Sequence, residues 1–304
     1  MIMAATPEQT APEQTGLLSR TSKEFIAGTI GGMAQVLAGQ PFDIVKVRLT
    51  SSQGLGALAC TAQILKSEGP LAFWKGSLPP LLGVGACVSI QFGVVENMKR
   101  MIKAWNKGEE LSLVQQMFAG SIAGIANSII STPAEGHRIR MQVQGKIDPR
   151  GDPHYRSSAD CMKTIFKLHG LKGSFAGLKV TVLREAGTFA TYFGMYEYMV
   201  SVMKPAAGSV EDLSVWQLLL AGGMAGYAYW LPWYPIDAIK SKLQADSLAS
   251  PRYKGILDCL AQTVKNEGVR GLYRGFLPCM LRAFPANAAT FLTFEMIMRL
   301  LGRN

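Results

Sequence analysis

Long apolar stretches recur along the chain and predict membrane-spanning helices. Four of them contain no Asp, Glu, Lys or Arg: residues 25–42, 76–95, 111–134 and 213–236. Two further apolar stretches, 178–200 and 275–298, are interrupted by charges. A helix needs about 20 mostly apolar residues to cross a bilayer, so the pattern predicts six spans. Because charges inside a span are costly and face inward, Arg184, Glu185 and Arg282 are candidates for a functional site.

Three features repeat in the same order along the chain. The motif P-x-[DE]-x-x-[KR]-x-[KR] begins at Pro41, Pro133 and Pro235. A second motif reads "EGPLAFWKG" (68–76), "HGLKGSFAG" (169–177) and "EGVRGLYRG" (267–275). A glutamate then follows at Glu96, Glu197 and Glu295, and both later features recur at spacings of 101 and 98 residues. We therefore expect a disordered tail over residues 1–21 and three units at 22–104, 111–203 and 212–302.

Each unit also has an amphipathic segment between its two spans, such as "GILDCLAQTVKNEG" at 255–268. These segments predict three short helices on one membrane surface. Of the 31 Lys and Arg residues, 19 lie between paired spans, which marks these regions as the positive side of the membrane. The predicted fold class is an all-α membrane protein.

Composition narrows the functional class. Only 17% of the residues are charged, against about 25% in a typical soluble domain, and the formal net charge is +10. The five cysteines are widely spaced, and no pair has the spacing of a zinc site or a redox motif. We also find no Ser/His/Asp arrangement and no phosphate-binding loop. The sequence therefore indicates no enzyme, no metal site and no cofactor, and nothing in it suggests a nucleic-acid partner.

The triplicated motifs resemble those of the mitochondrial carrier family over residues 22 to about 302. The stretches "GVGACVSIQFGV" and "LRAFPANAATF", together with Arg184 and Glu185, are similar to the amino-acid, carnitine and ornithine branch, and most of all to its fungal amino-acid carriers. The resemblance implies six kinked transmembrane helices in a barrel with threefold pseudosymmetry and three short matrix helices. It also implies a monomer in the mitochondrial inner membrane, with both termini on the intermembrane-space side.

The resemblance assigns the motif charges to a gate on the matrix side. It implies three ion pairs between neighbouring repeats: Asp43–Arg138, Glu135–Lys240 and Asp237–Lys46. Gln142 and Gln244 are expected to brace these pairs from one turn away. Each motif proline would kink its helix, because it removes a backbone hydrogen bond and clashes with the preceding turn. Partly desolvated ion pairs suit a gate that opens in every cycle, because their attraction nearly balances their desolvation; a ring of permanent bridges is the alternative.

The family pattern also predicts an outer gate and a lipid site. Glu96, Lys99, Glu197 and Glu295 match the outer gate only in part, because Val200 and Met298 stand at two of its basic positions. The glycine that ends each second motif precedes a helix N-terminus, where exposed amides favour a phosphate, and the resemblance implies cardiolipin. The residues expected there are Trp74, Lys75, Gly76, Gly177, Tyr273, Arg274 and Gly275. We also expect Arg48 to pair with Glu68 and Lys242 with Glu267, whereas the middle repeat has His169.

The repeat register superimposes Gly83, Arg184 and Arg282, each 13 residues before its gate glutamate. At 1.5 Å per residue this is about 20 Å along the helix, near the middle of the membrane. Either arginine could hold an α-carboxylate in a bidentate manner, and Glu185 could take the ammonium group of the same zwitterion. Gly83, Val84 and Cys87 would leave room on the second span. A strongly dibasic substrate would want another acid here, which the sequence does not supply.

These observations favour a transporter of amino acids that works by alternating access through one central site. A carnitine, acylcarnitine or keto-acid carrier on the same fold is the alternative. A membrane-bound enzyme lacks a supporting constellation, and a permanent proton leak conflicts with the complete set of matrix gate charges. The sequence does not specify which amino acid is carried, whether transport is exchange or uniport, or whether protons are coupled to it.

Overall fold

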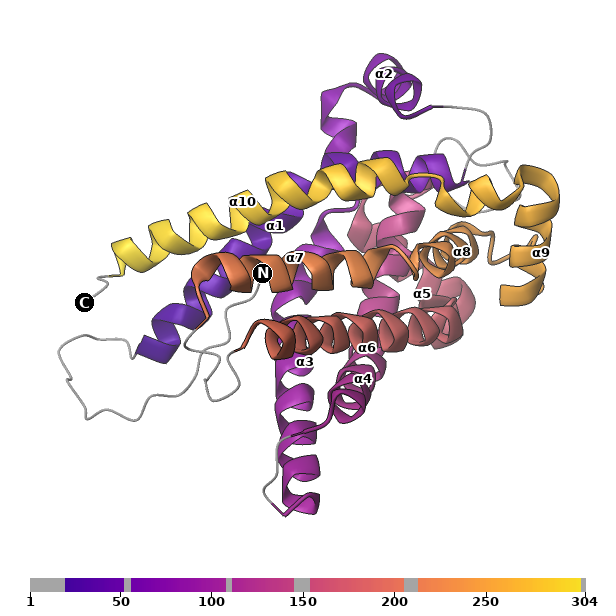
Figure 1. Ribbon diagram of the computed structural model, residues 1–304. Helices are drawn as coiled ribbons and strands as arrows, with labels where there is room; N and C mark the ends of the chain where they lie inside the picture. The colour runs from indigo at the N-terminus through magenta and orange to yellow at the C-terminus, as the bar shows by residue number, and fades with distance from the viewer. Residues whose placement is uncertain (1–19, 52–55, 108–110, 145–153, 205–212, 302–304) are drawn as a thin grey trace.

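The computed structural model describes residues 20–51, 56–107, 111–144, 154–204 and 213–301, and every regular element among them is a helix (Figure 1). The long helices are α1 (Arg20–Ser51), α3 (Leu78–Trp105), α4 (Leu113–Val143), α6 (Leu178–Met203), α7 (Val215–Trp230) with α8 (Tyr234–Ala245), and α10 (Phe276–Leu300). The shorter ones are α2 (Ala57–Glu68), α5 (Ser158–Ser174) and α9 (Ile256–Glu267), with the 3-10 helices η1 (Pro70–Trp74) and η3 (Val269–Tyr273). Of the tail predicted over residues 1–21, residues 1–19 lie outside the described residues, whereas residues 20 and 21 are helical and belong to α1. Residue 302, the predicted end of the third unit, also lies outside the described residues.

The threefold repeat is visible in the backbone itself. Among the described residues, the glycines with positive φ are Gly69, Gly76, Gly170, Gly177, Gly268 and Gly275. They form two sets of three, one at the start and one at the end of each second motif, with the same spacings in the chain. Glycine adopts this conformation at little cost because it has no Cβ. The motif therefore repeats because two left-handed turns recur before α3, α6 and α10.

Each short helix packs onto the end of the long helix before it, through a buried cysteine at the same register. Cys60 on α2, Cys161 on α5 and Cys259 on α9 are all fully buried. Cys60 packs with Ile44 of α1, and Cys259 packs with Ile239 of α8. Buried cysteine behaves as a small apolar side chain. Packing within the repeats thus explains three of the five cysteines.

The motif prolines act differently in the third repeat. Pro41 lies inside α1 and Pro133 inside α4, and both helices continue past them. In the third repeat α7 ends at Trp230 and α8 begins at Tyr234, so the helix is broken where we expected a kink. Pro232 lies in this break and Pro235 in the first turn of α8. Two prolines so close together remove two backbone donors, which explains the interruption.

The first and last long helices, α1 and α10, lie side by side (Figure 1). The chain also packs α3 on α4, α4 on α6 and α6 on α7. Helices of different repeats are therefore neighbours, which is needed for charges of different repeats to meet. Closure of these helices into a threefold barrel stays a prediction.

Two helices of the described residues are long and apolar enough to cross a membrane by composition alone: the one that ends at Trp105, and α4. Of the other expected spans, 178–200 and 275–298 contain charges and α7 is short, whereas the uncharged stretch 25–42 of α1 has too low a mean hydropathy. Large apolar side chains nevertheless face outward on α3, α7 and α10, among them Leu82, Leu220, Phe284 and Leu292. Extensive exposed apolar surface marks a membrane or a binding interface. It supports the prediction of six spans.

Candidate substrate site and gates

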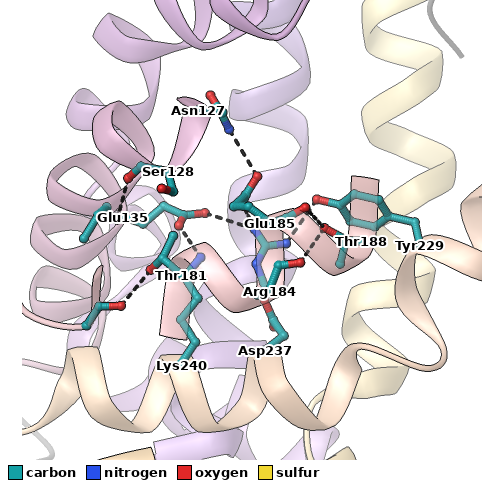
Figure 2. Close-up of polar contacts among 12 residues, drawn as sticks. Asn127, Ser128, Glu135, Thr181, Arg184, Glu185, Thr188, Tyr229, Asp237 and Lys240 are labelled. Atoms are coloured by element: carbon teal, nitrogen blue, oxygen red, sulfur yellow. Dashed lines mark hydrogen bonds and ion pairs between the residues drawn. The ribbon is translucent and has the colours of Figure 1, made fainter. Parts of the chain in front are cut away.

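Arg184 and Glu185 lie next to each other on α6 and are buried, with 5% and 2% of their surface exposed (Figure 2). Consecutive residues of a helix point about 100° apart, yet these long side chains bend together into an ion pair. Arg184 Nη1 also donates to Tyr229 Oη at 3.0 Å, and Glu185 Oε2 accepts from Asn127 Nδ2 at 3.2 Å. The pair is thus fixed from α7 on one side and from α4 on the other.

The three proline motifs meet through ion pairs. Arg138 pairs with Asp43 and Lys240 pairs with Glu135. Lys46 Nζ lies 2.6 Å from a carboxylate oxygen of Asp237. These contacts join α1 to α4, α4 to α8 and α8 to α1. They form a closed triangle across the three repeats, with the partners that the family pattern implied. We name it the matrix-side ring, after the side of the membrane on which the resemblance places it.

The two candidate substrate arginines also contact the acids of this ring. Arg184 lies 3.8 Å from Glu135 and 3.6 Å from Asp237. Arg282 Nε lies 3.2 Å from Asp43. Every acid of the ring is therefore shared between a motif cation and an arginine at the predicted substrate position. Sequence reasoning assigned the arginines and the ring separate roles, and it did not foresee this link.

The other predicted lining residues lie on α3. A Cβ placed at Gly83 would meet only the Ala134 side chain, at 3.9 Å, so this glycine leaves space. Val84 instead packs against Gly32 of α1. Cys87 is half-buried and lies within electrostatic range of Glu135 and Glu185. Of the three, Cys87 is thus the one shown close to the charged pair.

The predicted braces do not reach the ring. Gln142 is fully buried, and neither atom of its side-chain amide has a hydrogen-bond partner. Gln244 donates to Thr181 at 3.4 Å. Gln40 takes the bracing position in the first pair instead, because it accepts from Arg138 and donates to the Lys75 carbonyl at 3.1 Å. Gln40 stands directly before Pro41 and so lies outside the motif, which therefore could not identify it as a brace.

At the opposite end of the bundle one pair crosses between repeats. Lys99 of α3 lies 3.5 Å from Glu197 of α6, and both side chains are partly exposed. Glu295 pairs along its own helix with Arg299 at 3.1 Å, and Glu96 is exposed. Arg299 stands one residue after the expected basic position, so the sequence pattern missed it. Within the predicted outer gate, the Lys99–Glu197 pair thus joins helices of two repeats.

Acids of the second motifs link the short helices α2 and α9 to α1 and α8, which carry proline motifs. Arg48 pairs with Glu68, which also binds Lys75 at 2.6 Å. Lys242 binds Glu267 at 2.5 Å, and Arg274 binds the same carboxylate at 3.1 Å. Hydrogen bonds from Arg48, and after them from Lys75, lower the pKa of Glu68 to about 2. Both predicted pairs are present. Lys75 and Arg274, which were expected at the lipid site, bind the same two carboxylates.

The glycine that ends each second motif packs against a helix of another repeat, and that helix carries a proline motif. A Cβ on Gly76 would lie 3.0 Å from the Arg138 carbonyl, and one on Gly275 would lie 2.9 Å from the Lys46 carbonyl. Beside Gly275 is a cavity of roughly 240 Å³, which Tyr273, Arg274 and the start of α2 also line. The Trp74 indole instead donates to the Leu37 carbonyl at 3.1 Å. An expected lipid site therefore adjoins the matrix-side ring.

Comparison with known proteins identifies the class. A family profile described as mitochondrial carrier protein matches residues 19–104, 109–206 and 211–304. The chain therefore belongs to the mitochondrial carrier family, whose members are carriers and not enzymes.

Individual relatives cover nearly the whole chain. A mitochondrial glycine transporter of Saccharomyces cerevisiae is 43% identical, with 93% of each chain covered. A glutamate/glycine mitochondrial carrier of Schizosaccharomyces pombe is 42% identical, over 95% of this chain and 97% of its own. A mitochondrial basic amino acids transporter of Homo sapiens is 40% identical, over 90% of this chain and 89% of its own.

Proposed function

We propose that this protein carries amino acids across the mitochondrial inner membrane by alternating access through a single central site. The observation that carries the proposal is the buried Arg184–Glu185 pair in contact with the matrix-side ring. A buried cation and anion side by side match the two charges of an amino acid. The printed names of the relatives, which specify glycine, glutamate/glycine and basic amino acids, support the same substrate class.

Substrate binding would exchange existing ion pairs for new ones. The α-carboxylate would take the guanidinium of Arg184 or Arg282, and Glu185 would take the ammonium group. Charge-assisted and bidentate bonds of this kind are among the stronger hydrogen bonds in proteins. Because the protein partners are released as the substrate binds, the net free energy stays small. A small net value suits a site that must release its substrate on the other side.

The matrix-side ring would close the site toward the matrix and open in every cycle. Its three pairs join different repeats, so the helices can separate only if these pairs break. The attraction within a buried pair roughly offsets its desolvation, provided that both partners are present. We propose that Lys99 and Glu197, with Glu96 and Glu295 nearby, help to close the outer face in the other half of the cycle.

The remaining features of the proposal follow the family pattern. Residues 22–104, 111–203 and 212–302 form the three repeats, and both chain ends face the intermembrane space. The protein acts as a monomer. Cardiolipin binds at the N-termini of α3, α6 and α10, where the cavity beside Gly275 supports a lipid site.

Transport into liposomes tests the proposal. Purified protein is reconstituted with an internal pool of amino acids, and uptake of labelled amino acids, carnitine, keto acids and nucleotides is followed. We expect amino-acid uptake, reduced at least about tenfold in Arg184→Ala and Arg282→Ala because each loses a charge-assisted contact of about 1.5–3 kcal/mol. Arg100→Ala, at an exposed position of α3, should transport normally.

Other outcomes would contradict the proposal. Uptake of keto acids or carnitine alone, or amino-acid uptake that is indifferent to both arginines, would show that the central site is wrongly assigned. Proton conductance without substrate would instead indicate a leak.

A further inference from the structure

We propose that Asn127 and Tyr229 belong to the substrate site, and that Asn127 decides whether it accepts one ammonium group or two. This inference rests on the proposed amino-acid transport and narrows it to amino acids with a single ammonium group. No motif contains either residue, and both became visible through their contacts with α6.

The two residues occupy the same position in different repeats. Asn127 stands six residues before Pro133, and Tyr229 stands six residues before Pro235. Their side chains therefore reach the site from equivalent points on α4 and α7 (Figure 2). Gln35 is the equivalent residue of α1, but it donates to Asn287 of α10 at 3.4 Å. Gln35 is thus the equivalent position of the first repeat, and it contacts α10 and not the Arg184–Glu185 pair.

Asn127 supplies half of a site for an ammonium group. It is 4% exposed, and its amide nitrogen donates to Glu185 Oε2 at 3.2 Å. Its amide oxygen is also buried but accepts no hydrogen bond from the protein. Buried polar atoms are normally hydrogen-bonded, and an ammonium group has three N–H donors. The Asn127 oxygen and the Glu185 carboxylate together provide acceptors for one such group.

A second ammonium group would lack a carboxylate of its own. The other described acids around Arg184 are Glu135 and Asp237, and they already hold Lys240 and Lys46. Asp43 holds Arg138 and Arg282 in the same way. An uncompensated charge in a buried site is expensive, so lysine or arginine should be poor substrates. An aspartate at position 127 would supply the missing carboxylate beside Glu185.

Tyr229 positions the cation of the pair. Its hydroxyl accepts from Arg184 Nη1 at 3.0 Å, and its ring centre lies 5.9 Å from the guanidinium carbon. The ring also packs edge-on against Phe189 at 5.9 Å and Trp230 at 5.1 Å between centroids. Tyr229 is therefore held rigidly and restricts the orientations of Arg184. Loss of its hydroxyl should weaken substrate binding more than turnover.

The test compares glycine and lysine uptake in proteoliposomes made from the full chain. The wild type should take up glycine and little lysine. Asn127→Asp should raise the lysine-to-glycine uptake ratio at least about tenfold, which corresponds to about 1.4 kcal/mol. Gln35→Glu, which adds an acid at the same register on α1, should leave the ratio unchanged. Tyr229→Phe should raise KM for glycine about tenfold and change kcat little.

The outcomes separate this inference from the function on which it rests. If the wild type takes up no amino acid, the proposed function fails. If the wild type takes up lysine as readily as glycine, only the single-ammonium inference fails. This comparison uses the wild type alone, so it does not depend on whether the variants fold. An unchanged ratio in a folded Asn127→Asp protein, or an equal shift in Gln35→Glu, would overturn the role of Asn127. A normal KM in Tyr229→Phe would overturn the positioning role.

Discussion

Arg184 Nε lies 3.6 Å from a carboxylate oxygen of Asp237, although Asp237 already holds Lys46 at 2.6 Å. One guanidinium thus serves both the candidate substrate site and the matrix-side ring. A substrate carboxylate that binds Arg184 would compete with Asp237 and with Glu135, which lies 3.8 Å away. Binding would therefore weaken the ring from its cavity side. This competition gives substrate binding a direct route to gate opening.

Loss of an acid from the ring should destabilise the protein strongly. In Asp237→Asn the buried Lys46 loses its carboxylate, and removing one partner of a buried pair costs about 3–5 kcal/mol. The matched change at the outer end, Glu197→Gln, affects a partly exposed pair at 3.5 Å, and such pairs contribute about 0–1 kcal/mol. We expect Asp237→Asn to lower the midpoint of thermal unfolding in detergent by at least about 5 °C. Equal shifts in both variants would contradict the asymmetry between the gates.

Gly124 allows α4 to approach the substrate pair closely. A Cβ at this position would lie 2.5 Å from the Glu185 backbone carbonyl, so Gly124→Ala must push α6 away. Overpacking of this kind costs about 1–3 kcal/mol, and it should lower amino-acid uptake at least about tenfold because Arg184 and Glu185 move. Gly226 has the same register in the third repeat, but a Cβ there meets nothing within 4 Å. Normal uptake by Gly124→Ala, or equal loss by Gly226→Ala, would contradict this account.

Glu68 should stabilise the protein throughout the physiological pH range. Its pKa in the folded state is about 2, below the model-peptide value of 4.5, because Arg48 and Lys75 bind its charged form. A depressed pKa contributes stability that is complete above the unfolded pKa and is lost as the pH falls through the folded pKa. Glu68→Gln should therefore lower the unfolding midpoint by a constant amount between pH 6 and 8. The difference from the wild type should shrink between about pH 5 and 2, and a constant difference over that range would refute this origin of the stability.

Features that depend on local backbone or on repeated motifs could be predicted from the sequence. The two glycines of each second motif are required by left-handed turns, and the surface helices follow from periodicity. The three pairs of the matrix-side ring came from the family resemblance, and the structure brings the same residues together. The break before Tyr234 had a signal in Pro232, which lies close to the motif proline.

Contacts between repeats could not be read from motifs. Asn127 and Tyr229 lie in apolar spans outside every motif, and their roles arise because α4 and α7 both pack on α6. The sequence offered one sign of their shared role, because each stands six residues before the proline of its motif. The same reason explains why Gln40 braces the ring and not the predicted Gln142 or Gln244. The packing of the helices, and not the position in the motif, decides which side-chain amide reaches Arg138.

The central claim, that an amino acid occupies a water-accessible site beside Arg184 and Glu185, can be tested through Cys87. The other four cysteines of the chain are buried, whereas Cys87 is half-buried and within electrostatic range of Glu135 and Glu185. A membrane-impermeant methanethiosulfonate reagent is applied to proteoliposomes, with Cys87→Ser as control, and modification is followed by mass spectrometry. We predict that Cys87 is modified, that this modification blocks uptake, and that saturating transported amino acid slows it at least about fivefold. Modification at the same rate with and without substrate would contradict the claim that the amino acid binds in this cavity.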